Sequence, residues 1–445
     1  MKAQLLKYWD SLRSSFWFVP TTMACLAVAL AVAAVEIDKT VGDDWLARLG
    51  WIYSGGAEGA SLLLGTVAGS MIAIAGTVFS MTLVALSLAS SQLGPRLLRN
   101  FMRDTVNQVV LGTFVATFLY CLLVLRTIRR ADEVAFVPHL SVSIGLLLAM
   151  VSIGVLIYFI HHVSVSIQAD EVVARVGTEL KDGIDRLFPG QLGQPGSEVL
   201  SASSDAALPA AFKREARPVG ALEDGYLQLI DADALMALAN EEDLLLRLER
   251  RPGHYLVRGQ TMVMVWPGER VTEALVEKLN GAFVFGNQRT STQDVEFPVR
   301  QLVEIAVRAL SPGINDPFTA VVCVDRLGSA LCSLAQRDLP SPLRFGADGR
   351  LRLVAQGSTF AGIVDTAFNQ IRQSARSNPA VAIRMLDAIS QIAGQLQHAQ
   401  HAACLQRHAD MIIRGAREAV PEAEDRLAVE VRYVATAQAL RRLHG

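Results

Sequence analysis

The sequence predicts a membrane protein in which four N-terminal transmembrane helices precede an α+β cytoplasmic region. Of its 445 residues, 51% are hydrophobic and the mean hydropathy is +0.32, which excludes an ordinary soluble chain and a disordered one. The long uncharged stretches are confined to the first third, and strand-like and helix-like patterns follow. Because 41 basic residues nearly balance 43 acidic ones, no nucleic-acid partner is expected.

Four segments have the length and apolar character of membrane spans and contain no Asp, Glu, Lys or Arg. They are approximately Trp17–Val35, Ala60–Ser90, Val109–Leu125 and Leu140–Ile160. The N-terminal tail and the second loop are basic, and the first loop is mainly acidic. The positive-inside rule therefore predicts cytoplasmic N- and C-termini, although the three arginines of the third loop run against it.

The second span is unusually long and carries two stripes of small residues. As a helix its uncharged part would extend roughly 46 Å, beyond a hydrocarbon core of about 30 Å. Small side chains recur every four residues, which lets helix backbones approach closely: Ser61, Gly65, Gly69, Ala73 and Thr77. The second stripe is rich in hydroxyl groups: Thr66, Ser70, Thr77, Ser80, Ser87 and Ser91.

These hydroxyl groups have two interpretations. They would line a water-filled path through the membrane, or they would pack against other helices and bond back to their own backbone. Beyond the span, Arg96, Arg99 and Arg103 share one helical face. We expect them to contact anionic lipid headgroups, or to surround the cytoplasmic mouth of a pore if the span lines one.

The cytoplasmic part divides into three predicted pieces after the transmembrane domain of residues 1–165. A connecting helix and a Gly, Pro and Ser-rich linker occupy residues 166–218. A small β-rich module follows at residues 219–290, with strands at GYLQLI and Thr261–Trp266 and with Asp231 capping a helix. Its segment Arg251–Glu269 resembles the hairpin of barrel-sandwich folds such as biotinyl and lipoyl domains, without their modified lysine.

Residues 291–445 are predicted to be mainly helical. A helix at about Thr292–Leu310 ends in the turn SPGINDP, after which Asp316 is placed to cap a helix that has Pro317 at its first position. A polar loop is expected from about Arg337 to Arg350. Further helices are expected to begin near Thr359, Pro379, His401 and Pro421.

The SPGINDP turn is also a candidate ligand site. Asn315 and Asp316 would bind a cation or a polar ligand, with Arg300 and Arg308 close in sequence. In the structural interpretation the same residues form a tight turn with a capping aspartate and ion pairs between helices. A ligand here would be regulatory, because no pair of nucleophile and base accompanies the turn.

Histidine and cysteine residues give no strong metal signal. His398, His401, Cys404 and His408 share about a third of one helix circumference, but ligands on a single helix seldom complete a zinc site. We therefore predict no metal and no other cofactor. The sequence contains no phosphate-binding loop, dinucleotide fingerprint, zinc-protease or serine-hydrolase motif, so we expect no catalytic residues and no enzymatic activity.

Two stretches resemble a known family. They are SSQLGPRLLRNFMRD, residues 90–104, and QDVEFPVRQLVEIAVRALSPGINDPFTA, residues 293–320. With four spans and a long soluble tail, the chain resembles the bacterial predicted membrane proteins called domain of unknown function 2254. This resemblance implies placement in the bacterial inner membrane and implies no particular chemistry.

The leading functional hypothesis is a homo-oligomeric ion channel whose second span lines the path and whose cytoplasmic domain assembles and gates it. Its expected partners are lipids, ions and other copies of the chain. The alternative is a membrane-anchored sensor or scaffold whose cytoplasmic domain binds a small molecule or a protein. An enzyme with a site at Asn315 and Asp316 is the third hypothesis.

Overall fold

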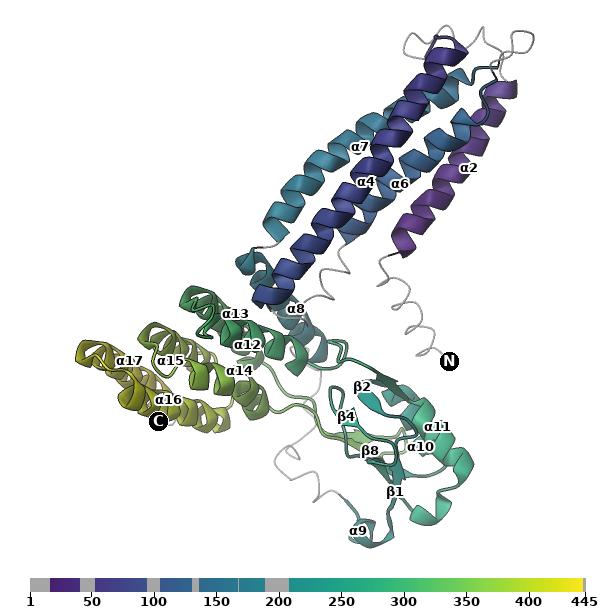
Figure 1. Ribbon diagram of the computed structural model, residues 1–445. Coiled ribbons are helices and arrows are strands. Elements are labelled where there is room, and N and C mark those ends of the chain that lie inside the picture. Colours follow the sequence, from purple (N-terminus) through teal and green to yellow (C-terminus); the bar gives the residue numbers. More distant parts are fainter. Residues whose placement is uncertain are drawn as a thin grey trace. The chain divides into compact units, whose positions relative to one another are not determined.

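The computed structural model describes residues 17–40, 53–93, 105–129, 136–166, 168–188 and 208–442 (Figure 1). The chain forms two compact units that meet in sequence at about Glu171 and Val172. The first contains the predicted spans, and the second contains every strand longer than an isolated bridge among the described residues.

The first unit is a bundle of long apolar helices. Its described helices are α2 (Phe18–Thr40), α4 (Ala57–Leu93), α6 (Thr105–Leu125) and α7 (His139–Ser166). All of them are long and apolar enough to cross a membrane, so the predicted N-terminal spans are confirmed at this level. Helix α6 lies in the middle of the bundle and contacts the other helices (Figure 1).

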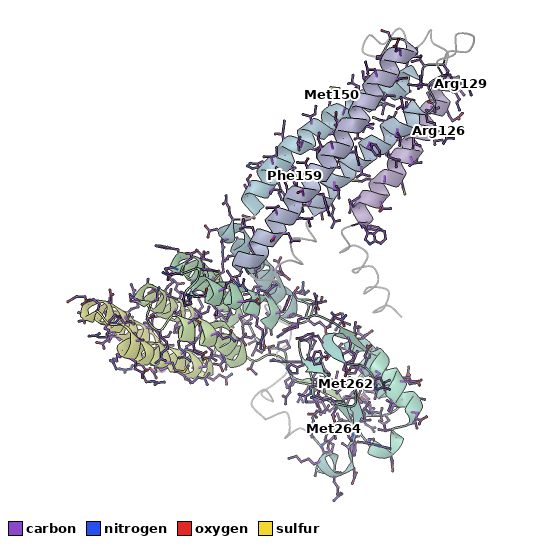
Figure 2. All side chains as sticks on the ribbon, viewed as in Figure 1. Arg126, Arg129, Met150, Phe159, Met262 and Met264 are labelled. Carbon is purple, nitrogen blue, oxygen red and sulfur yellow. The ribbon has the colours of Figure 1, made fainter. Side chains whose placement is uncertain are left out.

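Aromatic and hydroxyl side chains join these helices. Phe159 of α7 is buried with Phe114 of α6, whereas Met150 lies on the outside of the bundle (Figure 2). The hydroxyl groups of Thr117 and Ser152 are 3.0 Å apart and form a buried hydrogen bond between α6 and α7. Such a bond satisfies two polar groups that lipid could not solvate.

Asp38 near the end of α2 caps the start of α7. Its carboxylate accepts hydrogen bonds from the backbone N–H groups of Leu140 and Ser141, both at 2.9 Å, and from the Ser141 hydroxyl at 2.6 Å. These N–H groups belong to the first turn of a helix, where the helix itself provides no acceptor. Asp38 therefore connects two helices that are about 100 residues apart in sequence.

We expect Asp38→Ala to destabilise the bundle by about 1–2 kcal/mol, because the first turn of α7 loses its cap. Thermal unfolding of the full chain in detergent measures the effect. The control is Lys39→Ala, since among the described residues Lys39 forms an exposed ion pair with Glu36 within the same helix turn. Equal melting temperatures for both variants would contradict the role given to Asp38.

A further helix also meets the length and composition criteria for a span, so the structure has five candidates where the sequence predicted four. It is α13 (Pro317–Ala335), which lies in the second unit. Its apolar residues Cys323, Val324 and Leu327 are fully buried against neighbouring protein helices. Length and composition do not distinguish a span from a helix in the middle of a protein core.

The second unit begins with the amphipathic helix α8 (Ala169–Leu187), as predicted. Its sheets contain strands β1 to β8 in the described residues (Figure 1). One has the order β1-β5-β3-β8-β7, and the other has the order β4-β2-β6. The strands are β1 (Arg217–Gly220), β2 (Gly225–Ile230), β3 (Leu245–Leu248), β4 (Tyr255–Leu256), β5 (Thr261–Trp266), β6 (Phe283–Gly286), β7 (Leu343–Phe345) and β8 (Leu351–Ala355).

The barrel-sandwich detail is not confirmed. The segment Arg251–Glu269 is not a hairpin, because β4 pairs with β2 while β5 pairs with β1 and β3 in the other sheet. The expected polar loop of residues 337–350 contains β7, which pairs with β8. Strand β8 in turn pairs with β3 in parallel, across about 100 residues of sequence.

The helices confirm most of the local predictions. Short helices α9 (Phe212–Glu215), α10 (Ala232–Glu241) and α11 (Glu273–Gly281) accompany the sheets. The longer helices gather in another part of the unit (Figure 1). They are α12 (Glu296–Ala309), α13, α14 (Phe360–Ser374), α15 (Pro379–Ala393), α16 (Ala402–Ala419) and α17 (Ala423–Arg441). Asp231 and Asp316 cap α10 and α13 as predicted.

Candidate functional site

The hydroxyl stripe of α4 faces away from the other described helices of the bundle. Thr66, Ser70, Thr77, Ser80 and Ser87 are all exposed. The buried residues of α4 lie about half a helix turn away and pack against α6 and α7: Leu64, Ala68, Met71, Ala75, Val78 and Thr82. The stripe is therefore available to lipid, to water or to another copy of the chain.

Three hydroxyl groups of the stripe also bond to the backbone. Thr66, Ser70 and Thr77 donate to the carbonyl oxygens four residues earlier, at 2.7, 2.7 and 3.1 Å. This is the ordinary behaviour of such residues in transmembrane helices. It leaves the oxygen lone pairs of each hydroxyl group able to accept a further hydrogen bond or to face a cation.

The small-residue stripe is not used for packing within the chain over most of its length. A Cβ atom added at Gly65 or Gly69 would meet no atom within 4 Å, and Ala73 and Thr77 are exposed. Only Ser61, at its start, is buried. A surface of small residues that packs on none of the described helices is suited to contact with a second chain.

Other predicted residues of this region lie outside the described part of the chain. They are Arg96, Arg99 and Arg103. Ser91 belongs to α4, but its side chain is likewise outside the description.

The SPGINDP turn has a clear structural role. The Asp316 carboxylate accepts hydrogen bonds from the backbone N–H of Thr319 at 3.1 Å and from its hydroxyl at 2.5 Å. Asn315 has a positive φ of 50°, a conformation that asparagine tolerates better than most residues. These features fold the chain tightly between α12 and α13. Both carboxylate oxygens of Asp316 accept hydrogen bonds in the cap of α13.

Arg300, one of the two arginines near this turn, has a carboxylate partner other than Asp316. Arg300 pairs with Glu296 at 3.4 Å, one helical turn earlier in α12. Arg308 contributes its backbone carbonyl, which accepts a hydrogen bond from the Ser311 hydroxyl at 2.6 Å. The described contacts therefore place Arg300 beside Glu296, which also pairs with Arg251.

The histidine and cysteine residues near α16 have separate partners. His398 lies in the turn before the helix and contacts Asp338 at 2.9 Å, and His401 stacks on Phe360. Cys404 donates to the His401 carbonyl, and the fully buried His408 contacts Asp365 at 2.7 Å. Among the described residues, no three His, Cys, Asp or Glu side chains are arranged to hold a metal ion.

One cleft of the second unit was not predicted from the sequence. It has a volume of about 500 Å³ and lies where the parallel strands β3 and β8 end. The residues that follow β3 form one wall: Glu249, Arg250, Arg251 and His254. The residues that follow β8 form another, and they lead directly into α14: Gln356, Gly357, Thr359 and Gly362. Crevices at the carboxyl ends of parallel strands are common ligand sites in proteins.

A buried ionic network supports the first wall of this cleft. Arg251 contacts Glu296 of α12 at 2.6 Å and the Ser358 hydroxyl at 2.8 Å. Arg289 contacts Asp294 at 2.6 Å, and burial raises the pKa of that carboxyl against the opposing effect of Arg289. The Glu296 and Asp294 side chains are 7% and 4% exposed, so the arginines balance carboxylates that water does not solvate.

The sequence contains the signal of this cleft only in two separated fragments. The Arg-Arg-Pro-Gly-His segment at residues 250–254 and the Gln-Gly-Ser-Thr segment at residues 356–359 are each unremarkable alone. Their proximity follows from the parallel pairing of β3 with β8. Sequence periodicity does not reveal such pairing, because it specifies the face of a strand and not its neighbour.

Comparisons with known proteins agree with the architecture. The model of a family described as predicted membrane protein (DUF2254) matches residues 13–391. The uncharacterized protein Rv1290c of Mycobacterium tuberculosis is 32% identical over 429 residues, which are 94% of this chain and 80% of that protein. The uncharacterized protein Mb1321c of Mycobacterium bovis has the same identity and coverage.

No solved structure matches this chain. The family match extends from the first span into α15 and includes both stretches that carried the resemblance in the sequence. With several apolar helices that could cross a membrane, the chain is a multi-pass membrane protein. It belongs to the predicted membrane protein family DUF2254.

Proposed function

We propose that this protein is a homo-oligomeric ion channel, or a channel-like permeation protein, of the bacterial inner membrane. In this proposal helix α4 lines the ion path. The second unit lies in the cytoplasm, as do both termini of the chain, and it assembles the oligomer and gates the path. The observation that supports the proposal is the exposed hydroxyl stripe of α4, which lies opposite the face that packs on α6 and α7. No enzymatic activity and no cofactor are part of the proposal.

Symmetry explains why a single chain would leave this stripe exposed. When copies assemble around an axis, a face without a partner among the described residues is turned to that axis, to the neighbouring copy or to lipid, and we propose the first of these for the hydroxyl stripe. The small-residue stripe shares part of the same face and would allow adjacent α4 helices to approach. Hydroxyl groups on the axis would then replace part of the hydration shell of a permeating ion.

The same face also provides an apolar constriction. Val84 lies among the hydroxyl positions and is 67% exposed. Rings of such side chains gate channels by excluding water. Since α4 contains no ionisable residue after Glu58, its path would have no ring of fixed charge within the membrane.

Cysteine accessibility in conducting protein tests the proposal. The full chain is reconstituted into planar bilayers in a background in which the exposed Cys25 is replaced by serine. Thr77→Cys and Ser80→Cys are then treated with a charged, water-soluble thiol reagent. We expect ionic current from the untreated proteins and block of that current after treatment, because both positions are exposed on the stripe.

Phe79→Cys is the matched control. Phe79 is 45% exposed but lies about a third of a turn from the stripe, so the reagent should leave its current unchanged. A folded protein that passes no current in any salt would overturn the proposal. So would equal block at all three positions, since α4 would then have no face directed to the path.

The second candidate function is a membrane-anchored sensor or scaffold. The polar cleft between β3, β8 and α14 favours it, because it provides a ligand-sized cavity in the second unit. In that case the hydroxyl groups of α4 only bond to their own backbone and the bundle is closed to ions. Binding of a ligand by the full chain together with the absence of any current would favour the sensor over the channel.

A further inference from the structure

The cleft at the ends of β3 and β8 contains an excess of positive charge. Its lining includes Arg247, Arg250 and Arg251, and the acidic lining residue is Glu249. Arg247 pairs with Glu249 at 2.7 Å, and its guanidinium also lies 5.3 Å from the centre of the Phe212 ring. Arg251 pairs with Glu296. The buried Nε of Arg250 has no hydrogen-bond partner among the residues that the structure describes.

His254 provides a second buried donor at the same cleft. Its Nε2 accepts a hydrogen bond from Arg251 Nε at 3.4 Å, so the proton of the neutral ring belongs on Nδ1. Nδ1 is buried and has no partner within the described part of the chain. Burial, followed by the charges of Arg251 and Arg250, lowers the pKa of His254, so the free cleft holds a neutral imidazole near pH 7.

The start of helix α14 lies at the opposite wall, where Thr359 and Gly362 line the cleft. This helix has 15 residues, and Thr359 caps it by accepting the N–H of Gly362 at 3.1 Å. The helix itself offers no acceptor to the other N–H groups of its first turn. A helix N-terminus carries a partial positive charge, and Gly357 and Gly362 leave room for a ligand to approach the backbone.

Because Arg247 and Arg251 each have a carboxylate partner, Arg250 is the lining arginine that has no ion pair among the described residues, and the occupant we infer is a negatively charged acceptor. Arg250 and His254 both line the cleft, and each has a buried nitrogen without a partner among the described residues, whereas buried polar groups in native proteins are normally paired. Guanidinium groups together with a helix N-terminus match the oxygens of a phosphoryl group. A volume of about 500 Å³ exceeds what a lone phosphate needs and lies in the range of small-molecule sites.

We propose that this cleft binds a phosphate-bearing ligand, with Arg250, His254 and the first turn of α14 as its contacts. The phosphoryl group belongs either to a soluble metabolite or to a lipid headgroup. The proposal concerns binding only and is independent of the channel function proposed above. It assigns a ligand site to a region where the sequence showed no motif.

Titration calorimetry of the full chain in detergent, with inorganic pyrophosphate as the probe, tests the proposal. We expect saturable binding to the unmodified protein and an affinity about tenfold or more weaker for Arg250→Ala, because a charged hydrogen bond is lost. Arg250→Lys keeps the charge without the planar fork and should lie between the two. Arg258→Ala is the matched control, since Arg258 is exposed outside the cleft on the same module.

The pH dependence distinguishes a ligand contact from a merely structural histidine. An anion beside His254 raises its pKa, so binding should tighten as pH falls below neutral. Arg250, Arg251 and Arg289 act against this protonation, and Glu296 favours it. Protonation of pyrophosphate itself changes its affinity with pH in the same way for both proteins. The additional tightening at low pH that comes from His254 should be absent in His254→Gln.

A second arm identifies the source of the phosphate. The titration is repeated in lipid nanodiscs with and without phosphatidic acid. If pyrophosphate binds equally well in nanodiscs with and without phosphatidic acid, the natural ligand is a soluble phosphate compound. If pyrophosphate binding is lost only when phosphatidic acid is present, the lipid headgroup occupies the cleft. Absence of saturable binding to the unmodified protein in detergent would overturn the proposal, as would equal affinities for Arg250→Ala and Arg258→Ala.

Discussion

Replacing Arg289 by alanine is expected to lower the local free energy of unfolding around α12 by about 3–5 kcal/mol, because a buried charge loses its partner. Arg289 Nη2 lies 2.6 Å from Asp294 Oδ2, and the Asp294 side chain is 4% exposed. Without the guanidinium, that carboxylate has little water around it. Hydrogen exchange of the full chain, followed by mass spectrometry across residues 289–309, measures the loss of protection.

The effect of this substitution should depend on pH in a defined direction. Burial already raises the pKa of Asp294 in the folded protein, and removal of Arg289 raises it further. The folded state then binds a proton more readily than the unfolded state, so stability falls as pH rises. The deficit of Arg289→Ala should therefore shrink as pH is lowered from neutral towards the raised pKa of Asp294.

Arg300→Ala is the control for this experiment. Arg300 lies 3.4 Å from Glu296, but its own side chain is 47% exposed and Arg251 remains as a partner of Glu296. Such a pair contributes about 0–1 kcal/mol. If Arg289→Ala and Arg300→Ala lose the same protection from hydrogen exchange, the Arg289–Asp294 pair does not stabilise α12 more than an exposed pair does.

Phe368→Ala is expected to destabilise the helical part of the second unit by about 3–5 kcal/mol, because it leaves a cavity in a close-packed core. Phe368 of α14 is fully buried, and its ring lies 5.8 Å from that of His408 on α16 in an edge-to-face arrangement. Exchange of the backbone amides in α14 and α16 reports the loss.

Phe318 offers a matched control of the same residue type. It belongs to α13 in the same unit and is 81% exposed. Phe318→Ala removes the same atoms without opening a cavity, so it should change stability by no more than about 0.5 kcal/mol. A large loss for Phe318→Ala would mean that another molecule covers this side chain, and a small loss for Phe368→Ala would contradict its place in the core.

Features that depend on neighbouring residues were predictable from the sequence. Asp231 and Asp316 cap helices because each carboxylate reaches an N–H group three residues later. Strand β5 was predicted from a continuous run of β-prone residues, Thr261–Trp266. The N-terminal spans were predicted because a membrane imposes both a length and an apolar composition on a helix.

Length and composition by themselves do not separate a span from a buried helix. Helix α13, which the sequence predicted as a capped helix after the SPGINDP turn, has the length and hydropathy of a span, and its Cys323, Val324 and Leu327 are buried among protein helices. Local signals did fail for strand pairing. Strands β4 and β5 are separated by a short turn region, yet they belong to different sheets. Local patterns do not identify the partner, because strand pairing depends on contacts made after the chain has folded.

The sequence by itself therefore determined the membrane spans, the helix caps and the hydroxyl composition of α4. Tertiary structure alone decided that the hydroxyl stripe faces away from the other described helices of the bundle and that β8 lies beside β3. That pairing brings Arg250 and His254 to the first turn of α14, over about 100 residues of sequence. Periodicity reports which side of an element is apolar, whereas a cleft depends on which elements meet, and only long-range packing specifies that.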